Sequence, residues 1–170
     1  MAGQEIVEQV WDATERFGKC GKFGGAVTIE IIKQGLQEQG IRTSARDVFV
    51  NGVPIEIDLI IPRRGAKPTL GGLLYEPMEV AVALEIKKSG CYGRQSLTSI
   101  RHSFKQLAAK GVRSAYVTLE ERKSYRYRAT RENIGVPCFT LHWHQPESED
   151  FKATKDWEKL LAFLLRATRA

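Results

Sequence analysis

The segment Val80–Lys88, which reads Val-Ala-Val-Ala-Leu-Glu-Ile-Lys-Lys, constrains the fold more than any other part of the chain. Its apolar start predicts a buried β-strand. Because strand side chains alternate between two faces, Val82 and Leu84 lie on a core face. Glu85 and Lys87 share the opposite face, about 6–7 Å apart along the strand. An acid and an amine placed there cost free energy unless they meet an ion or a charged ligand, so the strand predicts a functional site.

The size and composition of the chain are those of one soluble globular domain. A chain of 170 residues can bury a sizeable core, and 42% hydrophobic with 27% charged residues is typical of that class. Lysine and arginine number 26 against 20 acidic residues, a net charge of +6. This moderate excess favours a polyanionic partner such as nucleic acid.

The cysteines and the N-terminus indicate a cytoplasmic protein. Cys20, Cys91 and Cys138 are far apart and form no Cys-x-x-Cys pair, which favours reduced thiols over a disulfide framework or a metal cluster. The start of the chain, Met1–Gln9, is polar and acidic, unlike a signal peptide. No apolar run approaches the roughly 20 residues of a membrane span, so we expect no membrane partner.

The N-terminal part of the chain predicts two helices separated by a glycine-rich turn. Gln4–Phe17 carries a helical apolar stripe. Gly18–Gly25 lacks the ending of a phosphate-binding loop, so we interpret it as a hinge or turn. Val27–Gln39 is expected to be a helix that stops at Gly40, although its first, β-branched residues would also suit a strand.

The middle of the chain predicts a β-hairpin followed by a long connection. Val48–Val50 and Val53–Ile61 flank Asn51-Gly52, a strong hairpin-turn signal. Pro62–Pro77 is rich in Pro, Gly and basic residues, and it reads as an excursion between strands. The strand Val80–Lys88 follows directly.

The C-terminal part predicts a helix over Arg94–Lys110, a strand over Ala115–Leu119 and a polar, basic connector over Glu121–Arg131. A further strand over Pro137–Trp143 and a closing helix over Thr154–Arg169, with Thr154 as its N-cap, follow. The whole order predicts an α/β fold with a mixed central sheet of about five strands flanked by helices. We expect one domain over residues 1–170, with an N-terminal helix and hinge in 1–22, a core in 27–143 and a C-terminal helix in 154–170.

Asp58 and Glu85 are predicted to lie on neighbouring strands, each on a polar face. Two carboxylates beside a backbone carbonyl, here that of Ile86, form an oxygen-rich site suited to Mg²⁺. Such a metal can acidify water and neutralise charge on a scissile phosphate, and Lys87 would lie beside the attacking water. The alternative is a surface ion pair of Glu85 with Lys87 or Lys88. Two further acid-x-Lys triplets, at Glu121 and Asp150, follow no strand-borne acid and read as solvated surface.

With these residues the sequence resembles the PD-(D/E)XK nuclease superfamily, the restriction-endonuclease-like fold, from about Val27 to Trp143. Asp58 matches the first acid of the motif, and Glu85 and Lys87 match the second acid and the lysine. Ile57 replaces the family's proline, and the connection between the two acids is long. The resemblance extends in part to archaeal Holliday-junction resolvases, which place a glutamate on the first helix, as Glu30 is placed here.

The resemblance implies a Mg²⁺-dependent endonuclease, with Mn²⁺ as a substitute and no small-molecule cofactor. Glu30 would be a further metal ligand, and Gln95 a polar residue supporting the site, but both also suit exposed helix positions. Glu56 is an alternative extra ligand, although a surface acid at a strand end fits it better. His142 and His144 flank Trp143 with ligand-like spacing, but no third soft ligand is near, which disfavours a zinc site.

Basic residues are predicted to contact the DNA backbone, with Tyr125 and Tyr127 interleaved for base stacking. They are Arg63, Arg64, Lys67, Lys88, Arg94, Arg101, Lys105, Arg126 and Arg128. A homodimer is compatible with cutting two strands, and the helix Gln4–Phe17 is a candidate surface for it. The alternative function is a nucleic-acid-binding subunit of the same fold without its own cleavage activity.

Overall fold

A four-stranded mixed sheet forms the centre of the molecule in the computed structural model, which describes residues 1–17, 21–90, 93–124, 126–144 and 152–169. Its strand order is β3-β5-β6-β7. The strands are β3 (Leu59–Pro62), β5 (Val80–Ser89), β6 (Ser114–Glu121) and β7 (Cys138–Trp143). β3 runs antiparallel to β5, whereas β5, β6 and β7 are parallel.

A second, three-stranded mixed sheet has the order β2-β1-β4. It consists of β1 (Val48–Val50), β2 (Val53–Ile57) and β4 (Leu74–Tyr75), with β1 antiparallel to β2 and parallel to β4. The expected α/β class, with mixed sheet flanked by helices, is confirmed. The single sheet of about five strands is instead two sheets, because the chain changes partners between β2 and β3.

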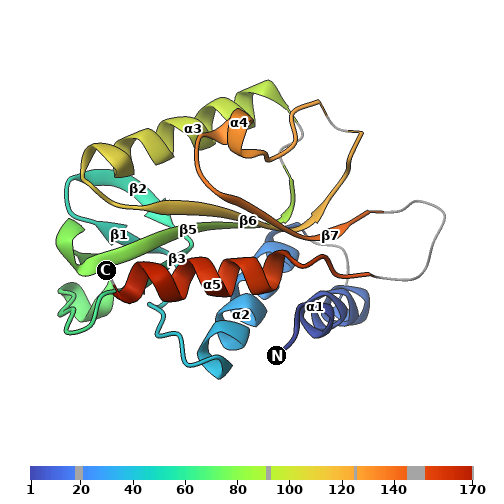
Figure 1. Ribbon diagram of the computed structural model, residues 1–170, viewed down its shortest axis with the longest axis horizontal. Helices are drawn as coiled ribbons and strands as arrows, with labels where there is room; N and C mark the ends of the chain where they lie inside the picture. Colours follow the sequence, from blue (N-terminus) through green and yellow to red (C-terminus); the bar gives the residue numbers. More distant parts are fainter. Residues whose placement is uncertain (18–20, 91–92, 125, 145–151, 170) are drawn as a thin grey trace.

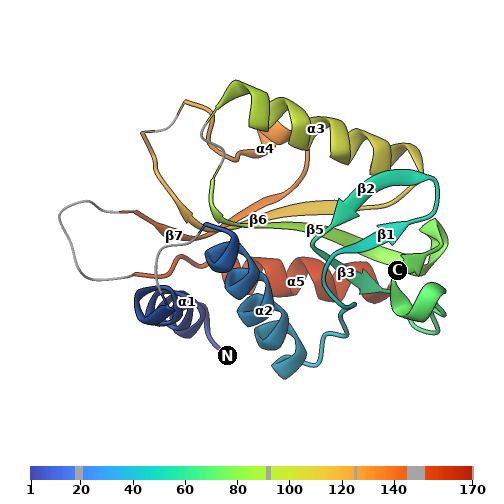
Figure 2. The same ribbon diagram turned by 180° about the vertical axis from the view of Figure 1, so that it is seen from behind.

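Helices cover both faces of the central sheet. α3 (Arg94–Ala109) and the short α4 (Arg131–Ile134) lie on one face, and α3 is the crossover that makes β5 and β6 parallel. α1 (Gly3–Phe17), α2 (Gly21–Glu38) and α5 (Asp156–Arg169) lie on the other face (Figures 1 and 2). Among the described residues, no helix is long and apolar enough to cross a lipid bilayer.

The alternation of β5 directs its side chains into two separate cores. Val82, Leu84 and Ile86 join the cluster formed with α1, α2 and α5. Ala83 joins the cluster that contains Phe104 of α3. Since alternate residues share a face, Glu85 and Lys87 lie on the α3 side of the sheet, as Ala83 does.

The glycine-rich turn expected over Gly18–Gly25 is wrong for residues 21–25, which form the beginning of α2; residues 18–20 lie outside the described part. The helix predicted from Val27 therefore starts at Gly21. The cause is tertiary packing: a Cβ at Gly24 would lie 3.0 Å from Cδ of Lys88. Glycine here allows α2 to approach β5 closely, which offsets its low helix propensity.

The strand expected over Val53–Ile61 is two strands, β2 and β3, that separate at Asp58. β2 pairs with β1 in the small sheet, whereas β3 pairs with β5 in the large one. The long connection after Pro62 contains β4 and two 3₁₀ turns, Leu70–Gly72 and Pro77–Glu79. A capping box between the Glu76 and Glu79 side chains and backbones stabilises the second turn.

The polar connector expected over Glu121–Arg131 is wrong at its first residue, because β6 extends to Glu121 and that side chain is 1% exposed. Its carboxylate accepts hydrogen bonds from the backbone N–H groups of Arg122 (3.0 Å) and Ala129 (3.2 Å). These bonds satisfy the buried carboxylate in part, but burial outweighs them and raises the pKa of Glu121 above its ordinary value. The closing helix begins at Asp156, whose N–H donates to Oγ1 of Thr154 (3.0 Å), two residues before the helix.

We predict that Leu84→Ala lowers the free energy of unfolding by about 2–5 kcal/mol, because Leu84 is fully buried at the centre of β5. The matched control is Leu73→Ala, since Leu73 is 47% exposed, and a change within about 0.5 kcal/mol is expected there. Urea unfolding followed by circular dichroism measures both. Equal effects at the two positions would contradict the assignment of β5 as the central strand.

Candidate active site

The site is built at the residue where the chain passes from one sheet to the other. Asp58 lies between β2 and β3, and its Oδ2 accepts a hydrogen bond from the backbone N–H of Ile86 (2.7 Å). β3 and β5 pair Leu59 with Leu84, so one further step of this antiparallel ladder places Asp58 opposite Glu85. The two carboxylates predicted from the sequence to lie on neighbouring strands are therefore neighbours across the sheet.

Lys87 joins the two acids. Its Nζ lies 2.6 Å from Oε1 of Glu85 and 3.4 Å from Oδ2 of Asp58. The side chains of Asp58 and Glu85 are 15% and 23% exposed, and that of Lys87 is 40% exposed. The cluster is thus partly buried but open on one side, which is the arrangement a site for an external ligand requires.

The charges in this cluster shift one another's pKa. Burial raises the pKa of Glu85 above its ordinary value, and the Asp58 charge raises it further against the opposing effect of Lys87. Burial lowers the pKa of Lys87, but the Glu85 and Asp58 charges outweigh it, so the pKa of Lys87 is raised overall. Lys87 is therefore a protonated hydrogen-bond donor at neutral pH rather than a general base.

The donor set suits a hard divalent cation in part. Asp58 and Glu85 supply carboxylate oxygens, and the pKa of Glu85 is raised by burial first and then by the like charge of Asp58, which a bound cation would offset. The Ile86 carbonyl follows Glu85 on the same strand, while its N–H already holds Asp58. Within the described ranges no three or more His, Cys, Asp or Glu side chains gather as a metal cluster, so backbone and water ligands would have to complete the shell.

Glu30 and Gln95 are not brought into this cluster by any contact of the described residues. Glu30 lies on α2 with its side chain 58% exposed, and its Oε1 pairs with Lys33 three residues later (3.0 Å). Gln95 is exposed in the first turn of α3. Glu56 is exposed on β2, in agreement with a surface acid.

Of the residues predicted to contact DNA, those on α3 are exposed, whereas Lys88 on β5 packs against the helices α1 and α2. Arg94, Arg101 and Lys105 are exposed on α3, which lies on the same side of the sheet as Lys87. Lys88 is the next residue on β5 after Lys87, so its side chain points to the opposite face of the sheet. Its Nζ lies 5.1 Å from the centre of the Trp11 ring, and its stem packs on Gly24, so it contacts the helical layer.

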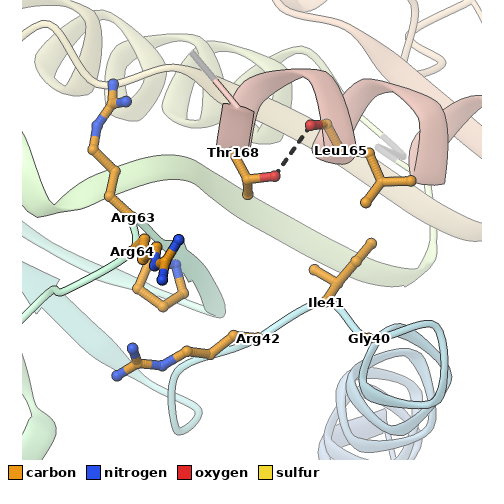
Figure 3. A pocket seen from close by; sticks show the side chains of 8 residues that line it. Gly40, Ile41, Arg42, Arg63, Arg64, Leu165 and Thr168 are labelled. Carbon is orange, nitrogen blue, oxygen red and sulfur yellow. Dashed lines mark hydrogen bonds between the residues drawn. The ribbon is translucent and has the colours of Figure 1, made fainter.

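Arg63 and Arg64 line a cavity of about 240 Å³ at the far end of β3 from Asp58 (Figure 3). Arg42 completes a group of three arginines there, which we call the arginine pocket. Leu165 and Thr168 of α5 face Ile41 across it (Figure 3). Lys67 is exposed further along the same connection. The sequence did not predict Arg42 as a site residue. A lone arginine shortly after the end of α2 gives no local signal of a pocket.

Two other polar features were also missed. A Cβ at Gly90 would collide with the carboxylate of Glu121, so glycine is required where the end of β5 passes that buried acid. The Oγ1 of Thr118, directly beside Lys87 in the β5–β6 pairing, is buried. Neither has a local sequence signal, because the contacting residues are about 30 positions apart.

His142 and His144 belong to no group of three or more His, Cys, Asp or Glu side chains among the described residues. His142 is 4% exposed, and its Nδ1 lies 3.0 Å from the carbonyl oxygen of Lys152. His144 pairs with Glu120 at the end of β6. Of the other predicted DNA contacts, Arg126 lies over the Tyr127 ring at 5.7 Å, and Arg128 donates to the carbonyl oxygen of Lys123 (3.0 Å).

Comparison with solved structures shows which fold this is. The chain is similar to NucC of P. aeruginosa ATCC27853 in its cAAA-bound form, with a TM-score of 0.66 and 9% identity over 97% of this chain and 88% of that one. NucC of E. coli MS115-1 in its cAAA-bound form gives a TM-score of 0.64 with 11% identity, over 98% and 85%. The apo form of the same protein gives 0.52 with 14% identity, over 99% and 90%.

At these identities the likeness shows the fold alone: the chain shares with these structures its α/β fold of mixed sheets flanked by helices. The narrower resemblance to archaeal Holliday-junction resolvases gains no support from these structures. No protein-family model matches the chain. No curated protein sequence matches it either.

We predict that Glu85→Gln changes the pH dependence of stability. The raised pKa of Glu85 means that the folded state binds its proton more tightly than the unfolded state. Stability of the parent protein should therefore fall as pH rises from about 4.5 through the folded pKa, by at most about 1.4 kcal/mol per pH unit from this group. The variant should lack this fall.

The measurement is urea unfolding between pH 4.5 and 8 for parent, Glu85→Gln and the control Glu158→Gln, an exposed glutamate on α5. The difference between Glu85→Gln and the parent should grow with pH, whereas that of the control stays constant. A constant difference for Glu85→Gln would rule out the coupling of Glu85 to its buried surroundings.

Proposed function

We propose that this protein is a metal-dependent DNA endonuclease that hydrolyses phosphodiester bonds. One observation carries the proposal: Lys87 Nζ lies within 3.4 Å of carboxylate oxygens from both Asp58 and Glu85, at the end where β3 meets β5. An acid from one strand and an acid and a lysine from the next are the parts that phosphodiester hydrolysis needs. The shared fold with NucC supports the assignment.

Asp58 and Glu85, with the carbonyl of Ile86, would hold a Mg²⁺ or Mn²⁺ ion. The bound cation would neutralise charge on the phosphate and acidify water. The Ile86 N–H fixes the orientation of Asp58, so one carboxylate oxygen is held by the backbone. Glu30 and Gln95 stay proposed as supporting residues, of which Glu30 would have to leave Lys33 to take part.

Lys87 has a role that follows from its charge. Its raised pKa keeps the amine protonated, so it can donate hydrogen bonds to the attacking water or to the negative charge that develops on the phosphate. Its ammonium group also opposes the rise in the pKa of Glu85 that burial and the Asp58 charge cause. A neutral side chain of similar length provides neither effect.

DNA is the proposed partner because the helix on the Lys87 side of the sheet carries exposed cations. Arg94, Arg101 and Lys105 form an exposed stripe on α3, above the face that carries Lys87. The net charge of +6 adds a general attraction for a polyanion. A homodimer stays a prediction; the apolar face of α1, with Ile6, Val7 and Val10 fully buried in its own chain, is not available as its interface.

We predict that purified protein cleaves DNA with Mg²⁺ or Mn²⁺ and that EDTA abolishes cleavage. Asp58→Asn and Lys87→Met should each lower the rate about 10²-fold or more, because each removes a charge that acts on the transition state. Lys155→Met, which removes an exposed lysine, is the matched control and should cleave normally. A gel assay on supercoiled and linear DNA measures the rates.

Undiminished cleavage by both Asp58→Asn and Lys87→Met would overturn the proposed site. Tight DNA binding with no cleavage by the parent, together with no heat of Mn²⁺ binding in calorimetry, would favour the alternative of a binding subunit that relies on a partner for catalysis.

A second candidate function, ligand binding in the arginine pocket, is favoured by a separate observation. The pocket combines Arg42, Arg63 and Arg64 with the apolar side chains of Ile41 and Leu165. This mixture suits a ligand that has both phosphates and bases. We propose cAAA, named as the bound ligand of two of the similar NucC structures, as the ligand to test there.

Calorimetry with cAAA should give binding that Arg42→Gln and Arg63→Gln each weaken about tenfold or more, because each removes a charge-assisted contact to phosphate. Asp58→Asn should bind cAAA normally, since Asp58 lies at the other end of β3. Parent protein that binds no cAAA, or arginine variants that bind it equally well, would exclude this function for the pocket.

A further inference from the structure

A second basic pocket, of about 360 Å³, lies at the edge strand β7 and is lined by residues of β7, of the segment leading into α4 and of the start of α5. Its rim carries three cations, Lys123, Arg128 and Arg131, and its wall carries the indole ring of Trp143 and the hydroxyls of Thr130 and Thr140. Lys123 Nζ lies 5.7 Å from the centre of the Trp143 ring. We call this cavity the tryptophan pocket. Cations around an aromatic ring form a surface that matches a phosphate next to a base.

Hydrogen bonds among the described residues hold Arg128, one of these cations, and the backbone of Lys123. Glu121, which is buried, accepts the N–H of Ala129 (3.2 Å). Arg128 donates to the carbonyl oxygen of Lys123 (3.0 Å), and Asn133 Nδ2 donates to that of Arg128 (3.0 Å). A cavity with a fixed rim loses less entropy when a ligand binds.

The strand register places Thr140, in the lining of this pocket, on the same face as the proposed catalytic cluster, while Trp143, three residues further along the edge strand β7, alternates toward the other face. Lys87 pairs with Thr118 on β6, and Thr118 pairs with Thr140 on β7. Residues paired in adjacent parallel strands share a face, and strands lie about 4.8 Å apart, so Thr140 is about 10 Å from Lys87 across the sheet. One base step advances about 3.4 Å along a nucleic-acid strand, so about three steps span that distance.

The chemistry of the wall favours a base inside and phosphates outside. Asp156 lies in the wall, where its Oδ2 accepts the N–H of Thr140 (3.0 Å) and its Oδ1 pairs with Lys159 (2.8 Å). A carboxylate there repels a phosphate that enters deeply, while the cations at the rim attract one. The ring of Trp143 offers a stacking surface, but a base within a duplex has both faces covered by its neighbours.

We propose that the tryptophan pocket binds an unpaired nucleotide of the DNA strand that is cut, with its base on Trp143 and its phosphate on the rim cations. The proposal rests on the proposed endonuclease function and gives it a substrate class: DNA with single-stranded, bulged or mismatched positions. Duplex DNA without such positions contacts only the cations around the pocket and leaves the pocket itself empty.

The test is fluorescence anisotropy of full-length protein in EDTA, with three labelled DNAs: a single strand, its perfect duplex, and the duplex with one bulged nucleotide. The parent protein should bind the single-stranded and bulged DNAs about tenfold or more tighter than the perfect duplex. Trp143→Leu should lose this preference, and Trp143→Phe should retain most of it, because phenylalanine keeps a ring for stacking.

Arg131→Gln, which changes an exposed residue, serves as a second variant in case Trp143→Leu does not fold; it should weaken single-strand binding more than the control Lys155→Gln does. Equal binding of all three DNAs by the parent, or a preference unchanged in both Trp143→Leu and Arg131→Gln, would overturn the proposal. A separate cleavage assay with Mg²⁺ distinguishes the two claims: preference without cleavage contradicts the endonuclease function only, and cleavage without preference contradicts the pocket only.

Discussion

The hydrogen bond from the Ile86 N–H to the Asp58 carboxylate is the interaction on which the molecule depends most. It occurs where the chain leaves the small sheet and enters the large one, so it fixes both the junction of the two sheets and the position of the first acid. If one continuous strand ran through Asp58, it would pair with strands of one sheet only. The break between β2 and β3 is therefore what brings an acid from one strand beside the acid and lysine of another.

The two faces of β5 divide the molecule into a structural side and a chemical side. Val82, Leu84 and Ile86 bury the strand against helices and anchor it. Glu85 and Lys87 on the other face are only partly buried, and the free energy lost there is offset by the apolar face of the same strand. In this one strand, the buried apolar residues that stabilise the fold therefore alternate with the charged residues that cost it free energy.

Much of this arrangement follows from patterns within single segments. The alternation of Val80–Lys88 predicted the strand that carries Glu85 and Lys87, the Asn51-Gly52 turn predicted the hairpin before Asp58, and the helical stripe of residues 94–110 predicted α3. What could not be predicted depends on contacts between distant segments. Gly21–Gly25 is helical because Gly24 meets Lys88, and Glu121 is buried because Gly90 and Ala129 enclose it. The arginine and tryptophan pockets each combine three or more separate segments, so no local pattern marks them.

The adjacency of Lys87 and Lys88 has a consequence for how such a sequence can change. These neighbouring lysines enter opposite layers, one beside the carboxylates and the other against Trp11. A single inserted or deleted residue early in β5 would exchange the two faces, burying Glu85 among helices and exposing Ile86. Length variation should therefore be excluded from residues 80–89 and tolerated in the connection after Pro62, where glycines at positive φ already form the turns. Substitution can tune this strand, but changes in its length would destroy the fold and the site together.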